Sequence, residues 1–355
     1  MTPENLRVLF AGETMPGSRT PQRVRAFEQL GSVVTWIPTN RPDRTFEDPP
    51  TLEERIRYRL RRPRDEAGTN DALIQAASRG CDLVWLENAR VVKPQTLTTI
   101  KRLAPGAALV WYCEDDMMNP RLGSVWIDRA LPLFDLWVTT KSFNAQPEEM
   151  PSRGVRRVLF VDNSYDPSIH RRLDLSSAER KVLGADVAFI GTYEEPRATS
   201  LLRLAEAGIS VRVWGNGWAR LEGRHPRLKV EARPVYDDDY ARTINATRIN
   251  LAFLRKANRD LQTCRTMEIP ACGGFMLHER SAEAEALFAP DREAAYFGND
   301  EELAESCRRW LADETARAAV AEAGWHRAQS GHTHADRLQA VLKEVKMAST
   351  QTLGA

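Results

Sequence analysis

Glycines, arginines and hydroxyl residues gather in four short segments in the second half of this 355-residue chain. The segments are GTYEEPR (191–197), GNGW (215–218), RKANRDLQT (255–263) and HERS (278–281), and each follows an apolar run. Glycines let backbone N–H groups approach a ligand closely, and arginines bind phosphate oxygens in a bidentate manner. The four segments therefore predict a site for a phosphate-containing ligand.

One carboxylate, Glu268, lies in an otherwise apolar helical stretch that is broken by Pro270 and by Gly273-Gly274. We predict a helix over 260–271, whose first turn directs free N–H groups toward the same ligand. Arg265 lies three residues before Glu268, so the two side chains either face the ligand or pair with each other on the helix.

Two acidic clusters are further candidates for chemistry. Glu114, Asp115 and Asp116 follow an apolar run in the first half, at a position where strand ends bind ligands. The second cluster, 237–239, opens a predicted helix, where the helix dipole alone favours acidic residues. The five cysteines contain no C-x-x-C pair, and we predict no metal site.

The elements that position these residues alternate along the chain between apolar runs and helical segments. The apolar runs are continuous rather than alternating, which is typical of parallel strands covered on both faces. We predict strands at 6–12, 32–37, 82–87, 108–113, 136–140, 157–161, 187–191, 210–215, 249–254, 275–278 and 294–298. Helices are predicted at 20–31, 96–103, 197–207, 236–246, 260–271 and 300–311, and through most of the chain after Asp313.

This order predicts an α/β protein with two Rossmann-like domains, each a doubly wound parallel sheet, that face each other across a cleft. We predict an N-terminal domain at 1–161, a connection rich in Asn, Asp, Ser and Pro at 162–184, and a C-terminal domain at 185–332. The last segment, 333–355, is a predicted helix that crosses back to the N-terminal domain.

Composition excludes several classes of protein. The net charge is +1, which disfavours nucleic-acid binding, and no apolar run is long enough to span a bilayer. The N-terminus does not resemble a signal peptide, and the unpaired cysteines suit a reducing compartment, so we predict a cytoplasmic protein. The arginine-rich segment Arg55–Glu66 is either a solvated face or a contact for an anionic acceptor or membrane surface, at most a peripheral one.

Familiar nucleotide and hydrolase motifs are missing from the sequence. No G-x-G-x-x-G follows the first predicted strand, where only Gly12 and Gly17 occur. The sequence also lacks a P-loop and the G-x-S-x-G turn of α/β-hydrolases. These observations disfavour a dehydrogenase, a P-loop nucleotidase and a serine hydrolase.

The second half of the sequence also resembles a known protein family. Segments of the second half, chiefly RTMEIPACGGFMLHE (265–279), FIGTYEEPRATSLLRLAEAGISVRVWGNGW (189–218) and AGWHRAQSGHTHADRLQAVL (323–342), resemble the CgeB-like, spore-maturation-protein-type branch of the group 1 glycosyltransferases. The resemblance implies the two-domain GT-B fold and a role in bacterial glycan biosynthesis. The C-terminal domain would bind a nucleotide sugar (UDP-, GDP- or TDP-linked), and the N-terminal domain would bind the acceptor.

The resemblance also implies roles for individual residues. It assigns Glu268 to the ribose hydroxyls of the donor, Arg265 to the pyrophosphate, and Asp260 to the acidic position near the donor sugar, where the family often has glutamate. The remaining donor contacts implied by position are Thr263, Gly191, Thr192, Arg197, Gly215, Asn216, Trp218, Arg255 and Lys256. Trp214 and Trp218 either pack in the core or stack on the base.

The first half departs from the family because it has no histidine before His170 to contact the donor sugar. Asp115, Asp116 and Glu87 are the candidates to supply that contact or to act as the acceptor base. The implied reaction is retaining transfer without a metal or other cofactor. The alternatives are a non-catalytic protein of this fold that binds a nucleotide sugar or scaffolds partners, and a nucleotide-sugar epimerase.

Overall fold

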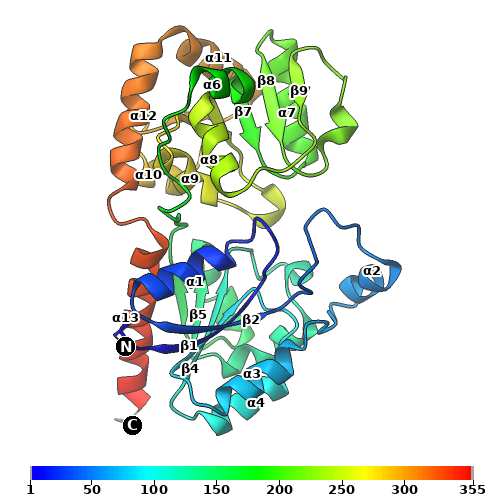
Figure 1. Ribbon diagram of the computed structural model, residues 1–355, viewed down its shortest axis with the longest axis vertical. Coiled ribbons are helices and arrows are strands. Elements are labelled where there is room, and N and C mark those ends of the chain that lie inside the picture. The colour runs from blue at the N-terminus through cyan, green and yellow to red at the C-terminus, as the bar shows by residue number, and fades with distance from the viewer. Residues whose placement is uncertain (1, 353–355) are drawn as a thin grey trace. The chain divides into compact units, whose positions relative to one another are not determined.

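The computed structural model describes residues 2–352, with side chains described for 2–346. The chain forms two compact units (Figure 1). The first consists of Met1–Asp162 and His334–Ala355, and the second consists of Asn163–Thr333. The predicted connection at 162–184 does not stand apart in the structure, because its residues from 163 onward belong to the second unit.

The first unit is built on a six-stranded parallel sheet with the order β2-β1-β3-β4-β5-β6. Apolar runs such as LVWLE and ALVWYC are buried along their whole length, as expected for strands covered on both faces. The strands are β1 (Arg7–Gly12), β2 (Val33–Pro38), β3 (Leu83–Glu87), β4 (Ala108–Cys113), β5 (Leu136–Thr139) and β6 (Val158–Phe160).

Helices cover both faces of this sheet. The helices of the first unit are α1 (Thr20–Gln29), α2 (Leu52–Arg59), α3 (Thr69–Ala77), α4 (Pro94–Leu103), α5 (Val125–Ala130) and α13 (His334–Thr352). Side chains of α3, α4 and α5 share one core cluster, whereas α1 and α13 contribute to the cluster on the opposite face. Short 3₁₀ turns at 120–122, 131–133, 142–145 and 150–153 complete the unit.

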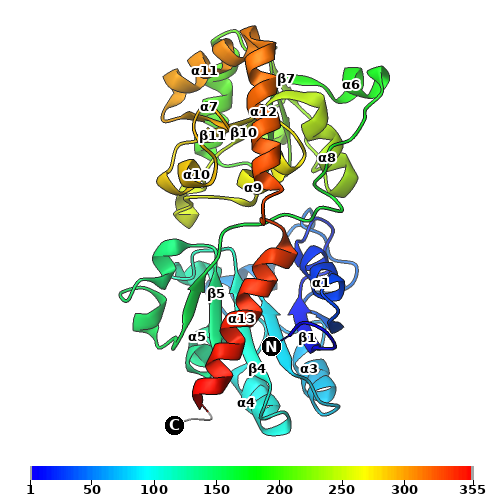
Figure 2. The ribbon, with the colours of Figure 1, turned by 90° about the vertical axis from the view of Figure 1, so that its left-hand side faces the viewer.

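The C-terminal helix is part of the first unit's core. Val341, Leu342 and Val345 of α13 are buried in the same cluster as Phe27 of α1 and Val138 of β5. Figure 2 shows α13 running across the sheet of this unit. The helix predicted over 333–355 is thus α13, and residues 353–355 lie outside the described part of the chain.

The second unit has a second six-stranded parallel sheet, with the order β12-β11-β10-β7-β8-β9. Helices α7 and α11 pack on one face and α8, α9 and α10 on the other, so this sheet is also doubly wound. The strands are β7 (Ala185–Ile190), β8 (Val211–Trp214), β9 (Leu228–Val230), β10 (Thr247–Ala252), β11 (Met276–Glu279) and β12 (Ala295–Phe297). The helices are α6 (Ser177–Leu183), α7 (Glu195–Glu206), α8 (Asp237–Ala246), α9 (Cys264–Ala271), α10 (Ala282–Leu287), α11 (Asp300–Ala312) and α12 (Glu314–Ala328), with 3₁₀ turns at 218–221 and 256–258.

The structure corrects one boundary that matters for the site. The helix predicted from Asp260 begins only at Cys264, because the preceding residues form a tight turn. Arg259 adopts a left-handed conformation (φ 46°), and the Asp260 carboxylate accepts hydrogen bonds from the backbone N–H of Arg255 (3.2 Å) and from Asn258 Nδ2 (2.7 Å). Asp260 therefore shapes the approach to α9 instead of lying on it.

Among the described residues, no helix combines the length and the apolar character needed to cross a bilayer.

Candidate functional site

The second unit places the four predicted segments at one edge of its sheet. The chain leaves β7 toward β8 on one side and later returns to β10 on the other side, so β7 and β10 are neighbours at the point where the winding direction reverses. In doubly wound sheets ligands bind at the carboxyl ends of the strands beside this point. Gly191 follows β7 and Arg255 follows β10, so both lie at this position.

Two glycines allow the loops after β7 and β8 to approach each other. Gly215 has φ 135°, and a Cβ atom there would lie 2.1 Å from the carbonyl oxygen of Gly191. A Cβ atom on Gly191 would lie 2.4 Å from Nη2 of Arg265. The two glycines therefore make room for backbone contact and for an arginine, as a binding loop requires.

The tryptophans next to these glycines belong to the core. Trp214 and Trp218 are both fully buried, and the Trp218 indole N–H donates to the carbonyl oxygen of Gly191 (2.7 Å). The Trp218 ring packs edge-on against Phe189 and Tyr193. The structure thus favours the packing alternative for both tryptophans, and Trp218 acts on the site by holding the Gly191 loop.

The first turn of α9 is held by a buried network. Thr263 precedes the helix, and its backbone N–H donates to Oγ1 of Thr266 (3.0 Å). Thr266 Oγ1 lies 2.8 Å from Nε2 of His278, and His278 Nδ1 lies against the carbonyl oxygen of Glu279. Since Nδ1 must donate to that carbonyl, the neutral ring accepts the Thr266 hydroxyl proton at Nε2. The network fixes α9 against β11.

Because this network contains a buried neutral histidine, we expect the free energy of unfolding to fall at acidic pH. Burial lowers the pKa of His278 to about 4, below the ordinary value of about 6.5. The unfolded chain therefore takes up the proton first, so the stabilisation is complete above pH 6.5 and is lost as the pH falls toward 4, by about 3 kcal/mol. Urea unfolding at several pH values should show this loss in the native protein and a flatter profile in His278→Gln. The exposed His326→Gln variant should keep the native profile, and an unchanged profile in His278→Gln would contradict this assignment.

Arg197 is a buried arginine at this edge of the sheet whose hydrogen bonds are incomplete. It lies in the first turn of α7, is 4% exposed, and its Nε and Nη2 atoms have no hydrogen-bond partner within the described residues. Nη1 donates to the carbonyl oxygen of Thr192 (3.3 Å), and Glu194 lies 3.6 Å from Nη2. A buried guanidinium with unused donors is costly unless a ligand completes its contacts.

A second arginine shares this environment. The guanidinium groups of Arg197 and Arg265 lie 5.4 and 5.2 Å from the centre of the Phe189 ring. Burial, together with the positive charge of Arg265, lowers the pKa of Arg197 to about 10. Two cations held together in a partly apolar setting favour an anionic ligand, which would relieve their repulsion.

The other predicted phosphate contacts have partners in the protein. Arg255 Nε pairs with Glu194 (2.8 Å), and Lys256 pairs with Glu279 while its side chain stays largely exposed. Thr192 and Asn216 form hydrogen bonds through their backbone carbonyl oxygens. The Thr192 carbonyl accepts from Arg197, and the Asn216 carbonyl accepts from the Tyr193 N–H. A cavity of about 260 Å³ at the ends of β10 to β12 is lined by Arg197, Lys256 and Glu194, among others.

Glu268 is buried in α9, where it is 3% exposed. The Tyr240 hydroxyl donates to it (2.8 Å), and Nε2 of His170 lies 3.7 Å away. Arg265 donates through Nε to the carbonyl oxygen of Ile190 (2.6 Å). Arg265 and Glu268 thus each bind a different partner, which favours the alternative in which they do not pair with each other on the helix. Burial, and then the Glu268 charge, raises the pKa of Tyr240 well above its ordinary value. Tyr240 and His170 were not predicted, because they come from distant segments.

The first unit has a polar cavity of about 160 Å³ at its own winding reversal, between β1 and β3. Arg23 lines this cavity, is 3% exposed, and pairs with Glu87 (2.6 Å) and with Glu114. Asp115 lines the cavity and pairs with Arg90 (3.3 Å). Glu13, which follows β1 directly, lines it as well, although it is not among the residues predicted from the sequence.

The acidic residues that the sequence offers as candidates have different surroundings in the structure. Asp116 is not among the residues that line this cavity. It is buried and accepts hydrogen bonds from the Met118 N–H and Asn144 Nδ2, both at 3.0 Å, so it anchors its own loop. The cluster Asp237–Asp239 forms the first turn of α8, as the helix-dipole interpretation predicts. The described residues include no group of three or more His, Cys, Asp or Glu side chains that could hold a metal ion.

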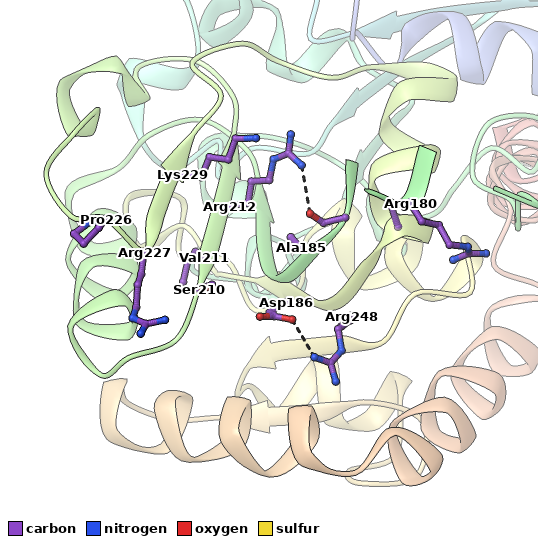
Figure 3. Close-up of a pocket in the computed structure, with 12 residues that line it drawn as sticks. Arg180, Ala185, Asp186, Ser210, Val211, Arg212, Pro226, Arg227, Lys229 and Arg248 are labelled. Carbon is purple, nitrogen blue, oxygen red and sulfur yellow. Dashed lines mark hydrogen bonds and ion pairs between the residues drawn. The ribbon is translucent and has the colours of Figure 1, made fainter. Parts of the chain in front are cut away.

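A second basic surface lies at the opposite edge of the second sheet. A cavity of about 500 Å³ at the amino ends of β7 to β10 is lined by Arg180, Arg212, Arg227, Lys229 and Arg248. Figure 3 shows Arg248 directed at Asp186, with which it pairs at 3.0 Å. Arg212 and Lys229 both pair with Glu231 (2.6 and 3.1 Å). Acidic side chains thus engage Arg212, Lys229 and Arg248 at 3.1 Å or less, whereas Arg197 Nη2 lies 3.6 Å from Glu194 and donates no hydrogen bond within the described residues.

Comparison with known proteins finds a family model that matches part of the second half of the chain. Residues 197–343 match a family model described as "Glycosyl transferase-like". A search of curated protein sequences found no match.

Solved structures share the fold over nearly the whole chain. Sucrose-phosphate synthase from Thermosynechococcus elongatus has a TM-score of 0.65 and 13% identity, and the alignment covers 97% of this chain and 100% of that one. Anabaena Alr3699/HepE in complex with UDP and glucose has a TM-score of 0.61 and 14% identity, with 96% and 100% covered. The α,α-trehalose 6-phosphate synthase of Burkholderia multivorans has a TM-score of 0.61 and 10% identity, with 98% and 100% covered.

These findings confirm the predicted α/β fold with two Rossmann-like sheets, and they support the resemblance to group 1 glycosyltransferases. The chain thus has the GT-B fold of glycosyltransferases, and its residues 197–343 match the glycosyl transferase-like family model.

Proposed function

We propose that this protein is a cytoplasmic glycosyltransferase of the CgeB-like branch that moves a sugar from a nucleotide-sugar donor to a hydroxyl group of an acceptor. The observation that carries the proposal is Arg197, a buried arginine at the carboxyl edge of the second sheet, whose Nε and Nη2 atoms donate no hydrogen bond within the described residues. A diphosphate offers the oxygens that these donors lack. The Anabaena structural neighbour was solved with UDP-glucose, which supports a UDP-sugar as the first donor to test.

We propose that the donor site is assembled from residues of the second unit that lie on α7, on α9 and in the loops after β7 and β8. Arg197 and Arg265 would bind the diphosphate, Thr263 and the first turn of α9 would add backbone N–H groups, and Glu268 would accept the ribose hydroxyls. The glycines at 191 and 215 would let the ligand approach the backbone. With this positive charge supplied by the protein, we propose that departure of the diphosphate needs no metal ion.

In the proposed reaction the bond between the anomeric carbon and the diphosphate oxygen breaks, and the acceptor oxygen forms a new bond to that carbon. The nucleoside diphosphate leaves with the electron pair, and the acceptor hydroxyl gives up its proton. We propose retention of the anomeric configuration, on the strength of the family resemblance. We propose the first-unit cavity for the acceptor hydroxyl, with Glu13 or Asp115 as the group that takes its proton.

Glu13 makes this assignment testable through pH. Burial, partly offset by Arg90 and reinforced by Glu87 and Asp115, raises the pKa of Glu13 above its ordinary value. A base must be ionised, so kcat/KM should rise with pH through that raised pKa.

The test compares pH–rate profiles of native protein and variants. Glu13→Gln should lower kcat by about 10²- to 10⁴-fold and abolish the acidic limb of the profile. Glu28→Gln, at an exposed position on α1, is the matched control and should leave the profile unchanged. If Asp115→Asn removes the limb and Glu13→Gln does not, the base is Asp115.

The function itself is tested with a panel of UDP-, GDP-, TDP- and ADP-sugars. Release of nucleotide, faster with an acceptor than by slow hydrolysis, supports the transferase. Isomerised sugar without nucleotide release would identify an epimerase instead, and binding without any conversion would identify a sensor or scaffold. If none of the nucleotide sugars binds, the donor-site proposal fails as well.

A further inference from the structure

Helix α2 belongs to the first unit and has no role in the proposed function. It lies on the long connection between β2 and α3 and extends away from the sheet (Figure 1). None of its residues is buried. The helix is nevertheless well defined, because Thr51 and Glu54 form a reciprocal capping box: Thr51 Oγ1 accepts the Glu54 N–H (3.2 Å), and the Glu54 carboxylate accepts the Thr51 N–H (2.5 Å).

One face of this helix is apolar and exposed to solvent. Leu52, Ile56 and Leu60 follow one another at intervals of four residues, which places them on one stripe. Their exposed fractions are 74, 50 and 59%, and Tyr58 is 56% exposed. Most other large apolar side chains of the described residues are buried in the four core clusters. A stripe left open in this way suits a surface that the protein binds.

The same segment concentrates positive charge. Residues 51–64 contain six arginines and two glutamates, a net charge of +4 in a chain whose total is +1. Three of the arginines are engaged by acidic side chains: Arg57 and Arg64 by Glu53, and Arg61 by Asp128. Arg59 and Arg62 are exposed, and their side chains have no ion pair or hydrogen bond within the described part of the chain.

We propose that α2 docks on an anionic lipid bilayer, with Leu52, Ile56 and Leu60 entering the boundary between headgroups and acyl chains. Arg59 and Arg62 would then pair with lipid phosphates. An exposed aliphatic stripe bordered by arginines fits the polarity gradient of a bilayer surface. A nucleic acid would match the arginines and leave the stripe unburied. The proposal does not depend on the donor site, so either can fail without the other.

The experiment is sedimentation of the full chain with vesicles of phosphatidylcholine alone or mixed with phosphatidylglycerol. We expect strong binding only to the anionic vesicles, and weaker binding at high salt. The double variant Ile56→Ser/Leu60→Ser should bind at least about tenfold more weakly, because the apolar contribution is lost. Arg59→Gln/Arg62→Gln should bind more weakly and lose much of the salt dependence.

Matched control variants test whether any exposed apolar side chain or arginine would have the same effect on vesicle binding. Val182→Ser removes an equally exposed apolar side chain (67%) on α6, and Arg224→Gln/Arg227→Gln removes two exposed arginines of the second unit. Both control proteins should bind as the native protein does. Thermal unfolding should show that all variants are folded, as expected for changes at exposed positions.

A direct readout comes from a fluorescent probe. All five cysteines are buried, so an Ile56→Cys variant can be labelled selectively with a polarity-sensitive dye. We expect a blue shift of the dye emission on addition of anionic vesicles. The proposal is overturned if anionic vesicles do not bind, if the Ile56→Ser/Leu60→Ser variant binds as well as the native protein, or if the segment binds nucleic acid and not lipid.

Discussion

Replacing Glu268 with alanine is expected to weaken nucleotide-sugar binding by about 10- to 100-fold, as loss of hydrogen bonds to a charged acceptor predicts. The residue is 3% exposed on the helix whose first turn lies at the winding reversal. Its carboxylate accepts a hydrogen bond from the Tyr240 hydroxyl (2.8 Å), the same kind of bond that we propose for the ribose hydroxyls. Isothermal titration with a nucleoside diphosphate and with its sugar conjugate measures the effect.

Controls must separate donor binding from stability. Loss of the carboxylate leaves the hydroxyl of the partly buried Tyr240 without this acceptor, which costs about 1–3 kcal/mol, so unfolding must be measured in parallel. Tyr240→Phe keeps the carboxylate and should bind donor with nearly native affinity. Glu305→Ala, at an exposed position on α11, should change neither property. A folded Glu268→Ala protein with native donor affinity would remove this residue from the site.

The second large effect is expected at Gly215. A Cβ atom there would lie 2.1 Å from the Gly191 carbonyl oxygen, which is backbone and cannot rotate away, and the residue also has φ 135°. Strain and overpacking together predict that Gly215→Ala destabilises the fold by about 3–5 kcal/mol. Urea unfolding should show a lower midpoint, and donor binding should weaken because the Gly191 loop is displaced.

Gly208 provides the matched control for this prediction. It also has a left-handed conformation, with φ 85°, but a Cβ atom there would meet nothing within 4 Å. Gly208→Ala therefore carries only the conformational cost, about 1–2 kcal/mol. If both variants lose the same stability, the close approach of the two loops contributes nothing.

Much of the fold follows from local patterns in the sequence. Buried runs such as LVWLE and ALVWYC predict parallel strands because both faces are apolar, and the helices between them predict double winding. The start of α9 was harder to predict. The sequence around Asp260 is compatible with a helix, and only the contacts from Asp260 to Arg255 and Asn258 show that it forms a turn.

The sequence predicts which residue types form the candidate site, but it does not predict their geometry. Arg197 was one of several candidate phosphate contacts, and its unused donor atoms became visible only once its burial was known. Glu13 was missed because its neighbours in space, Glu87 and Asp115, lie more than 70 residues away along the chain. The sheet order, with β1 between β2 and β3, brings them together.

The most direct measurement is the position of a nucleoside diphosphate in an experimental structure of its complex with this protein. The account predicts that the diphosphate contacts Arg197, Arg265 and the first turn of α9, and that the ribose lies at Glu268. A diphosphate bound instead in the basic cavity formed by Arg180, Arg212 and Arg248, at the amino ends of the strands, would contradict it.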